Sequence, residues 1–436
     1  MNETLRVGML GFGTVGQAVA RALERDATRI VSRTGRPIVL RRVAVRHPSK
    51  PRPILPHGVD VHADPLEVVE QGDVDVVVEV MGGEEPAFSA IRHAIASGKP
   101  VVTANKLVMA RHGPKLLQLA AERGVPLLFE AAVGGAIPII RPIRESLASD
   151  RVVGLMGILN GTTNFILTEM TESSSTTLAQ ALTQAQLRGY AEADPQADIS
   201  GFDAACKLAV LVSLAFDGWL APEDVHVSGL VGVDARDIQY ASELGLTIKL
   251  LAFAFLREDG VEAWVGPALV SKRHPLSQVR GINNAVVLVT QAAGDLMFYG
   301  AGAGGDPTAA AILGDVMDVA RRASSGHRQE ANGALPEAFV PGQRVATADP
   351  GRTVHRFYVR MQVVDRPGVL AAIAAVFGQH AVSIESVIQK GRGEDPVDLV
   401  FVTHEAPLAS VEAVLHTVGR LPVVVRTGPP MRVVGG

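Results

Sequence analysis

The sequence has a single cysteine, no long apolar run and no marked excess of either charge. Cys206 has no second cysteine to form a disulfide within the chain, so nothing indicates an oxidising compartment or a thiolate metal site. One of the most apolar stretches, residues 208–216, is far shorter than the roughly 18 residues that span a bilayer. Lys and Arg number 41 against 45 Asp and Glu, a net charge of −4. We therefore expect no membrane and no nucleic acid as a partner.

The first residues, MNETLRVGMLGFG, lead almost directly into a strand pattern and lack the basic and apolar regions of a secretory signal. A cytoplasmic location is the resulting expectation. The chain has 436 residues, of which 47% are apolar and 20% are charged, a balance typical of folded globular proteins. Its length predicts roughly two to four domains.

Residues 1–140 alternate short apolar strands with helical patterns. Such alternation predicts a parallel sheet with helices on both faces, so we expect an α/β domain of the Rossmann type. The expected strands are residues 5–10, 38–45, 74–80, 100–103 and 127–129, and the expected helices are 17–24, 88–97 and 107–123.

The pattern changes after Pro138, and residues 141–325 are interpreted as a central α+β catalytic and dimerisation domain. A helix that follows the Gly-rich residues 300–305 is expected to pack back on the first domain. The expected strands are 152–158, 248–256, 262–269 and 285–290, and the other expected helices are about 164–170, 178–188 and 200–216.

Residues 326–354 are polar, rich in Gly, Pro and Ala and without a clear period, so we expect a linker. From residue 355 to 436 the pattern reads strand, helix, strand, strand, helix, strand. This order is typical of a ferredoxin-like domain.

The motif GFGTVG, Gly11 to Gly16, fits the dinucleotide fingerprint because it stands directly between a strand and a helix. Gly11 would make the turn, Gly13 would let the backbone approach a pyrophosphate, and Gly16 would allow close helix packing. The second strand leads to Arg46, where an NAD-specific protein usually has an acid. Arg46, with Lys50, would suit the 2′-phosphate of NADP, and the alternative is an ordinary solvated charge.

Two later strands end in polar motifs, residues 81–83 (MGG) and 103–106 (TANK). The carboxyl ends of strands in open parallel sheets hold ligands, which makes Lys106 a candidate site residue. The alternative is that Lys106 is a surface lysine.

A buried helix after GYAEADPQADIS carries two charges, Asp203 and Lys207, one turn apart on one face. Lys207 is a candidate proton donor beside a carboxylate, and the alternative is an internal ion pair. Glu192, Asp194 and Asp198 crowd the start of this helix. Asp194 before Pro195 suits a cap or turn, and the remaining acids would suit a substrate with a cationic amino group.

Six segments together resemble homoserine dehydrogenase over about residues 4–325. The long acidic segment that ends at Lys207 makes the resemblance specific, because it is not a general Rossmann feature. The segment VVDRPGVLAAIAAVF, residues 363–377, resembles an ACT domain, and no aspartate kinase region precedes Leu5, so we expect the monofunctional form with a C-terminal ACT domain. The six segments are GFGTVG, TANK, EAAVGGAIP, NGTTNFIL, GYAEADPQADISGFDAACKLAVL and GAGAGGDPTA.

The resemblance implies reversible reduction of L-aspartate 4-semialdehyde to L-homoserine with NADPH or NADH, a step towards threonine, methionine and isoleucine. Lys207 would be the general acid, and Lys106 would orient and polarise the carbonyl oxygen. Glu192 and Asp203, with Asp198 beside them, would bind the substrate's amino end. By the same carry-over, the cofactor would contact Phe12, Gly13, Thr14, Val15 and Lys106, with Gly189, Glu192 and Gly304 nearer the nicotinamide. The fingerprint itself adds Gly11 and Gly16 to this cofactor site.

The resemblance also implies a monovalent cation, sodium, at the hinge between the first two domains. Its ligands would be the carbonyl oxygens of Glu130, Val133, Gly135 and Ile137. Without the resemblance these residues would be taken for an ordinary glycine-containing turn.

In the C-terminal module, Asp365, Gly368 and Val369 lie at the first strand-to-helix turn, where ACT domains commonly bind an amino acid. We expect inhibition by L-threonine, and the alternative is a module that mainly dimerises. Because edge strands in such folds pair readily, a homodimer or homotetramer is expected.

Two other functions remain possible at this point. A reductase of another short aldehyde or keto acid would keep GFGTVG but would not need the set of Glu192, Asp203 and Lys207. A catalytically silent amino-acid sensor would bind the cofactor only structurally, and intact Lys106 and Lys207 argue against it.

Overall fold

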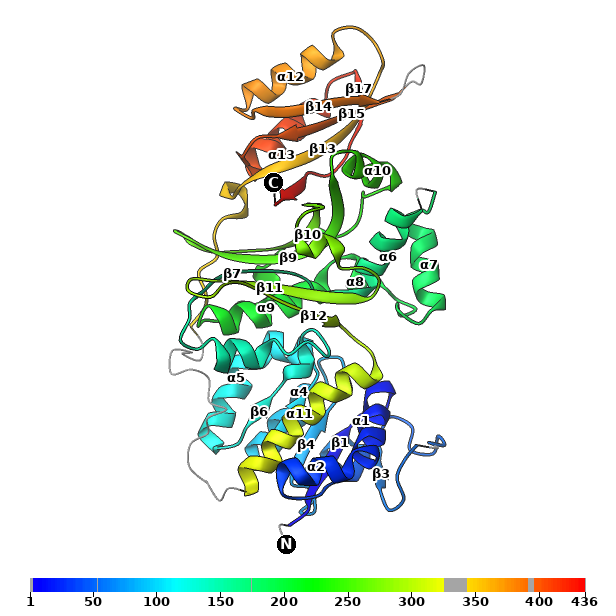
Figure 1. The fold of residues 1–436 in the computed structure, drawn as a ribbon, viewed down its shortest axis with the longest axis vertical. Coiled ribbons are helices and arrows are strands. Elements are labelled where there is room, and N and C mark those ends of the chain that lie inside the picture. The colour runs from blue at the N-terminus through cyan, green and yellow to red at the C-terminus, as the bar shows by residue number, and fades with distance from the viewer. Residues whose placement is uncertain (1–2, 53, 174, 325–342, 391–395, 436) are drawn as a thin grey trace. The chain divides into compact units, whose positions relative to one another are not determined.

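The computed structural model describes residues 3–435 apart from positions 53, 174, 325–342 and 391–395. The described chain forms two compact units. The first comprises 1–153, 206–222 and 285–345, and the second 154–205, 223–284 and 346–436 (Figure 1). The domain limits expected at residues 140, 325 and 354 stay predictions. Most of the expected linker, residues 326–354, lies outside the described residues.

The first unit contains a six-stranded sheet in the order β3-β2-β1-β4-β5-β6, with every pairing parallel. This is the Rossmann order, as predicted. The central strands β1, β4 and β5 are almost entirely buried, because helices cover both faces. The strands are β1 (Leu5–Leu10), β2 (Ile38–Ala44), β3 (Asp60–His62), β4 (Val76–Glu79), β5 (Val101–Thr103) and β6 (Leu127–Leu128).

Among the described residues of the first unit, six helices pack around this sheet. Helix α11 begins at the Gly-rich segment and packs against α1 and α2, where Ile312 and Val316 join the core formed by the strands (Figure 1). The helices are α1 (Thr14–Arg25), α2 (Ala27–Thr34), α3 (Pro65–Val69), α4 (Ala87–Ala96), α5 (Lys106–Arg123) and α11 (Gly305–Ser324). The first unit also holds the neighbouring strands β11 (Asn283–Thr290) and β12 (Gly294–Ala301) over most of their length.

The second unit is built on a longer sheet in the order β7-β9-β10-β18-β13-β15-β14. Short strands β8 (His226–Val227), β16 (Ala406–Pro407) and β17 (Val424–Thr427) pair with its members. The main strands are β7 (Val152–Ile158), β9 (Leu246–Arg257), β10 (Gly260–Ser271), β13 (Val354–Val363), β14 (Ile384–Lys390), β15 (Val397–Thr403) and β18 (Met431–Val434). The helices of this part are α6 (Gly161–Glu172), α7 (Leu178–Leu187), α8 (Gln196–Ile199), α10 (Ala235–Glu243), α12 (Val369–Gln379) and α13 (Leu408–Val418), and α9 (Phe202–Ala215) runs through both units.

The C-terminal module has the predicted order β13-α12-β14-β15-α13-β17 and its own apolar core. The sequence did not predict β18, a four-residue strand after Pro430. In it, Arg432 lies opposite Ala268 of β10 in a parallel pairing and opposite Phe357 of β13 in an antiparallel one. The module therefore continues the sheet of the second unit through its last strand.

A buried ion network holds this join. Glu262 of β10 accepts from Nη1 of Arg432 on β18 at 2.5 Å and is 2.6 Å from Nε2 of His355 on β13. Arg257 donates to the other carboxylate oxygen at 2.7 Å. Burial alone would raise the pKa of Glu262, but His355 and Arg432 hold this pKa at about 2. Removing one partner of such a buried set would leave an uncompensated charge.

None of the described helices is both long enough and apolar enough to cross a membrane.

Lys249 is a buried lysine on β9 with neutral acceptors. Its Nζ donates to Oδ1 of Asn164 on α6 at 3.0 Å and to the carbonyl oxygen of Val279 at 2.5 Å. The residue is 4% exposed, and burial lowers the pKa of Lys249 to about 8. The folded protein therefore binds fewer protons than the unfolded chain between about pH 8 and about pH 10.5, and stability rises with pH in that window.

We expect the unfolding midpoint of the wild type to rise relative to that of Lys249→Met between pH 7.5 and pH 9.5. The full shift from 10.5 to about 8 corresponds to about 3 kcal/mol, which sets the upper limit of the gain. Denaturant unfolding followed by fluorescence measures it, with exposed Lys272→Met as the control that should track the wild type. Equal pH dependence of wild type and Lys249→Met would contradict the expectation.

Candidate functional site

The fingerprint loop connects β1 to α1 and has the close contacts that its glycines predict. Gly11 has a φ of +98°, and a Cβ there would lie 2.7 Å from the carbonyl oxygen of Val80. A Cβ on Gly16 would lie 2.6 Å from the carbonyl oxygen of Gly11. A Cβ on Gly13 would meet nothing within 4 Å, which leaves open space at the start of α1.

Helix α1 begins without a side-chain cap and without an acid in its first turn. Its first N–H groups and its positive end are therefore suited to a phosphate. Phe12 of this loop is buried, Thr14 is exposed, and Val15 is partly buried. Gly305 packs against the loop, since a Cβ there would lie 3.3 Å from the carbonyl oxygen of Thr14.

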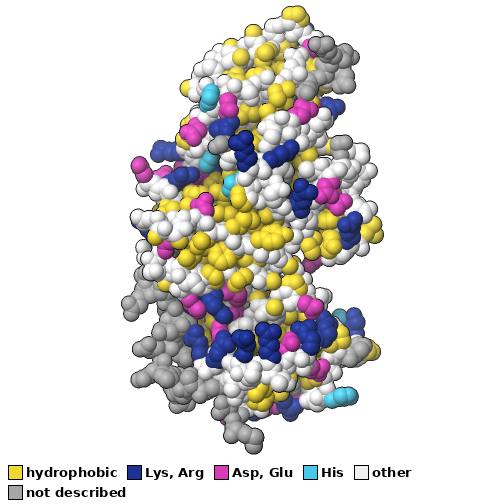
Figure 2. All heavy atoms as spheres, viewed as in Figure 1, with side chains coloured by type: hydrophobic (Ala, Val, Ile, Leu, Met, Phe, Trp, Pro, Cys, Tyr) yellow, Lys and Arg dark blue, Asp and Glu magenta, His cyan; other side chains and the backbone are white. Residues whose placement is uncertain are grey.

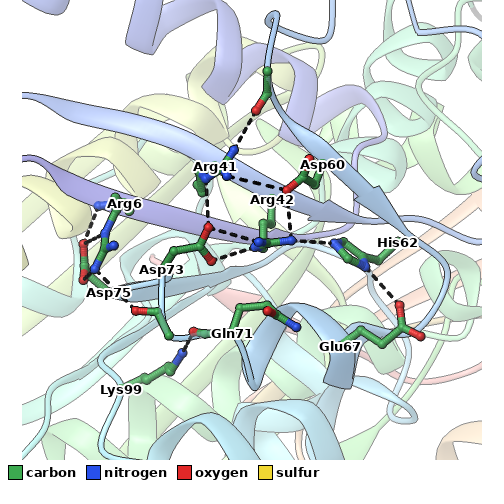
Figure 3. A network of polar contacts seen from close by, with 12 residues as sticks. Arg6, Arg41, Arg42, Asp60, His62, Glu67, Gln71, Asp73, Asp75 and Lys99 are labelled. Atoms are coloured by element: carbon green, nitrogen blue, oxygen red, sulfur yellow. Dashed lines mark hydrogen bonds and ion pairs between the residues drawn. The ribbon is translucent and has the colours of Figure 1, made fainter.

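Arg46 is exposed just after β2. Figure 3 shows the network that neutralises the two arginines within this strand, Arg41 and Arg42. Arg42 donates to Asp73 at 2.7 Å and lies 3.0 Å from Asp60, and Arg41 donates to Asp73 at 2.9 Å. The Arg42 guanidinium holds the pKa of Asp73 at about 2. Arg41 and Arg42 are thus structural, whereas Arg46 makes no ion pair with any described residue.

Lys106 is the first residue of α5, at the carboxyl edge of the sheet. Asn105 caps this helix by accepting from the N–H of Val108 at 3.1 Å, and its amide donates to the carbonyl of Gly83 at 2.7 Å. These bonds join the two strand ends that the sequence singled out and fix the start of α5. Lys106 is partly buried.

Glu79, the last residue of β4, is a buried carboxylate that the sequence reasoning missed. It accepts from the hydroxyl of Thr103 at 2.6 Å and from the N–H of Met81 at 2.8 Å. Burial raises the pKa of Glu79 above its ordinary value. An acid at the end of the apolar run VVVE was the available signal. Glu79 supports Asn105, because Thr103 in turn accepts from the Asn105 N–H at 3.0 Å.

The loop from residue 130 to 137 is largely buried, with Val133 and Ile137 at most 1% exposed. The carboxylate of Glu130 accepts from the N–H groups of Ile139, Ile140 and Arg141, at 2.7 to 2.9 Å. The oxygens that this loop can offer to a cation are therefore those of its backbone. The described residues contain no group of three or more His, Cys, Asp or Glu arranged to hold a metal.

Gly134 and Gly135 turn this loop with φ values of +73° and +57°. A Cβ on Gly135 would lie 2.6 Å from the carbonyl oxygen of Gly302, so the Gly-rich segment 300–305 touches this loop as well as α1. Gly304 has a φ of +125°. Asp315 of α11 accepts from the Glu130 N–H at 3.0 Å, and burial raises the pKa of Asp315 to about 7.

Helix α9 is almost entirely buried, and it carries Asp203 and Lys207 one turn apart as the sequence predicts. Asp203 is 7% exposed, and Lys207 is partly buried. Asp203 Oδ2 accepts from Nδ2 of Asn160 at 2.9 Å.

The same amide nitrogen of Asn160 donates to Asp198 Oδ1 at 2.7 Å, so the structure brings Asp198 and Asp203 together. Sequence reasoning did not single out Asn160. The signal was its place in NGTTNFIL, where an asparagine directly before a helical pattern is a typical N-cap.

Glu192 and Gly189 lie in an exposed turn after α7. Gly189 has a φ of +72°, and Gln186 donates to the Glu192 carbonyl at 3.2 Å. The Glu192 side chain is exposed, and it accepts no hydrogen bond from any described residue. Asp194 accepts from the N–H of Gln196 at 3.1 Å, the turn role that the sequence favours.

In the C-terminal module, a cavity of about 350 Å³ lies at the turn between β13 and α12. Asp365, Gly368 and Val369 line it together with Gln389 and Leu399. Gln389 donates to Asp365 Oδ1 at 3.2 Å, and Gly368 has a φ of +90°. The three residues predicted from the sequence therefore share one pocket.

Family models match three segments of the chain. Residues 11–130 match the homoserine dehydrogenase NAD binding domain, residues 138–317 match homoserine dehydrogenase, and residues 357–420 match the ACT domain.

The similar proteins match most or nearly all of the chain. A homoserine dehydrogenase of Synechocystis is 42% identical over 428 residues, 97% of each chain, and one of Corynebacterium glutamicum is 42% identical over 96% of this chain and 93% of its own. A crystal structure of a homoserine dehydrogenase from Thiobacillus denitrificans has a TM-score of 0.92 at 38% identity, covering 99% of this chain and 98% of the other. A hyperthermophilic archaeal homoserine dehydrogenase in complex with NADPH has a TM-score of 0.62 at 27% identity over 74% of this chain and 98% of its own.

Proposed function

The chain belongs to the homoserine dehydrogenase family, and from that premise we propose that Lys207 transfers the proton of the reaction while Asp198 and Asp203 hold the substrate's amino end. The enzyme is an NAD(P)-dependent oxidoreductase that acts on a CH–OH group. The observation that carries the assignment of roles is the buried helix α9, which presents Asp203 and Lys207 one turn apart. The two alternatives, a reductase of another substrate and a silent amino-acid sensor, are not favoured. Homoserine dehydrogenase models match residues 11–130 and 138–317, and an ACT domain model matches residues 357–420.

The reduction adds a hydride to the carbonyl carbon of L-aspartate 4-semialdehyde and a proton to its oxygen, giving L-homoserine. The nicotinamide supplies the hydride when bound. Lys207 gives its Nζ proton to the oxygen as negative charge develops there, and Lys106 orients and polarises that oxygen. In the oxidation direction Lys207 takes the hydroxyl proton back. Asp198 and Asp203 attract the ammonium group, and Glu192 is proposed as a further contact to substrate and cofactor.

The residues of the first unit fit a dinucleotide. Gly13 leaves open space before the uncapped start of α1, which suits a pyrophosphate. The proposed contacts are Gly11 to Gly16, Lys106 and Gly304 from this unit, with Gly189 and Glu192 from the exposed turn. Arg46 is proposed to bind the 2′-phosphate of NADP, and a relative bound to NADPH is consistent with this preference.

The loop at residues 130–137 fits a monovalent cation, since its backbone oxygens are hard ligands in a buried turn. We propose that the carbonyls of Glu130, Val133, Gly135 and Ile137 hold sodium. Its charge would draw these oxygens together and stiffen the turn that the Glu130 carboxylate already anchors.

A homodimer or homotetramer is proposed. Figure 2 shows hydrophobic side chains gathered over the middle of one face, where β11 and β12 lie. On β12, Met297 and Tyr299 are 40% and 57% exposed. A second copy would cover them. A cytoplasmic location stays a prediction from the sequence.

Lys207→Ala should lower kcat for L-homoserine oxidation by about a hundredfold or more, because general acids and bases contribute roughly 10² to 10⁴ in rate. A spectrophotometric assay of NAD(P)⁺ reduction measures it, and a fluorescence titration shows whether the cofactor still binds. Exposed Lys115→Met, which also removes one lysine charge, should keep its rate. Near-normal turnover of Lys207→Ala would exclude it as the general acid.

Arg46→Ala should raise KM for NADP⁺ by about tenfold and leave KM for NAD⁺ almost unchanged, because it removes a charge-assisted bond to the 2′-phosphate. Initial rates with each cofactor at saturating homoserine decide this. Arg92→Ala, the same change at an exposed position of α4, serves as the control. An equal effect on both cofactors would argue against a role at the 2′-phosphate.

We propose that the cavity at Asp365, Gly368 and Val369 binds L-threonine, with the carboxylate of Asp365 facing its ammonium group. Saturating threonine should lower the initial rate of the wild type, and Asp365→Asn should need at least about ten times more threonine for the same inhibition. Glu405→Gln, at an exposed acid of the same module, should respond as the wild type does. A wild type insensitive to threonine would favour a module that mainly dimerises.

A further inference from the structure

One amide links two acidic side chains of the second unit. Nδ2 of Asn160 donates to Asp198 Oδ1 at 2.7 Å and to Asp203 Oδ2 at 2.9 Å. An amide nitrogen carries two hydrogens, so one can serve each carboxylate. The two aspartates come from different elements, since Asp198 is in the short helix α8 and Asp203 is in the first turn of α9.

The other end of the same side chain is fixed. Oδ1 of Asn160 accepts from the N–H of Thr163 at 2.8 Å and from its hydroxyl at 2.9 Å, which makes Asn160 the N-cap of α6. Asn160 is 4% exposed. Its amide is therefore oriented by the helix, and both of its ends are used.

This arrangement solves an electrostatic problem. Asp203 is buried and Asp198 is partly buried, so their carboxylates repel each other with limited screening by water, and without a donor one of them turns away or takes up a proton. A fixed neutral donor between them keeps both charges in place without neutralising either. Each carboxylate oxygen can accept more than one bond, so such a pair can also bind a cationic group.

We propose that Asn160 is a positioning residue that holds Asp198 and Asp203 as one binding pair for the substrate's ammonium group. The proposal rests on the proposed function, in which these two aspartates bind the amino end. Asn160 acts on the substrate through the two carboxylates, and it takes no part in the transfer of the hydride or the proton. Its loss should therefore weaken substrate binding much more than it slows turnover.

Asn160→Ser separates this role from helix capping. Serine caps helices about as well as asparagine but is too short to reach both carboxylates. Asn160→Asp keeps the size and the capping oxygen and replaces the donor by a third acceptor. Each variant should raise KM for L-homoserine by about tenfold to a hundredfold, because hydrogen bonds to charged groups are lost. We expect kcat to fall by less than about fivefold and KM for the cofactor to stay unchanged.

The matched control is Asn164→Ser, one turn further along α6. Asn164 is equally buried, but it donates to the carbonyls of Gly281 and Asn283 and accepts from Lys249, away from the two aspartates. It should lower the unfolding temperature and leave KM for homoserine unchanged. A rise in KM for Asn164→Ser equal to that for Asn160→Ser would show a general effect of the helix and overturn the proposal.

Asp198→Asn and Asp203→Asn distinguish the proposal from its premise. If both raise KM for homoserine and Asn160→Ser and Asn160→Asp do not, the positioning role is wrong and the proposed function stands. If neither aspartate variant changes KM, the assignment of the amino-binding site fails, and the role of Asn160 fails with it. A wild type without homoserine-dependent turnover would reject the proposed function itself.

Discussion

A hydrogen-bond donor between two neighbouring acidic side chains offsets their repulsion, and in this chain the amide of Asn160 is such a donor to Asp198 and Asp203. The contacts of Gly161 and Asn164 account for two further residues of the motif NGTTN. Gly161 lets the backbone approach, since a Cβ there would lie 2.7 Å from the carbonyl oxygen of Ile282. Asn164 ties the same helix to residues 279–283. Residues 279–283 thus hold the start of α6 in place, and Asn160 at this helix start in turn holds the carboxylates of Asp198 and Asp203.

Buried acids have a related role in the first unit, where they accept hydrogen bonds from backbone N–H groups. Glu130 accepts three of them, from residues 139–141, and Glu79 accepts from Met81 at the end of β4. A carboxylate accepts several bonds at once, so it can hold a tight turn that a single hydroxyl could not. Glycines also make these tight turns possible. At Gly11 and Gly135 a Cβ would come within 2.7 Å of a carbonyl oxygen, so only glycine allows the loops to approach.

The sequence predicted the Rossmann domain, the ferredoxin-like module and most helices, because each of these elements has a strong apolar period and clear end signals. It did not predict α2, β3 and β18, which are short or polar, and whose formation depends on neighbours distant in the sequence. The same division holds for the site. Motif residues such as Gly11 and Lys106 could be found from their position after strands. Asn160 could not be assigned its two carboxylates, because Asp198 and Asp203 lie 38 and 43 residues further along the chain and nothing in the pattern pairs them with it.

The C-terminal module and the acidic turn, residues 198–203, both contact β10, so packed contacts connect them. On one edge β10 pairs with β18, and its Glu262 binds Arg432 and His355. It also pairs with β8, where Val265 lies opposite Val227. Gly201 of the acidic turn rests on these two valines, since a Cβ there would lie 3.0 to 3.2 Å from their side chains. Strand pairings and close-packed contacts of this kind do not deform gradually. A shift of the C-terminal module that strains β18 therefore acts on β10, against which the turn with Asp198 and Asp203 is packed. A ligand of the module can affect these aspartates through β10 only if it binds the shifted arrangement more tightly.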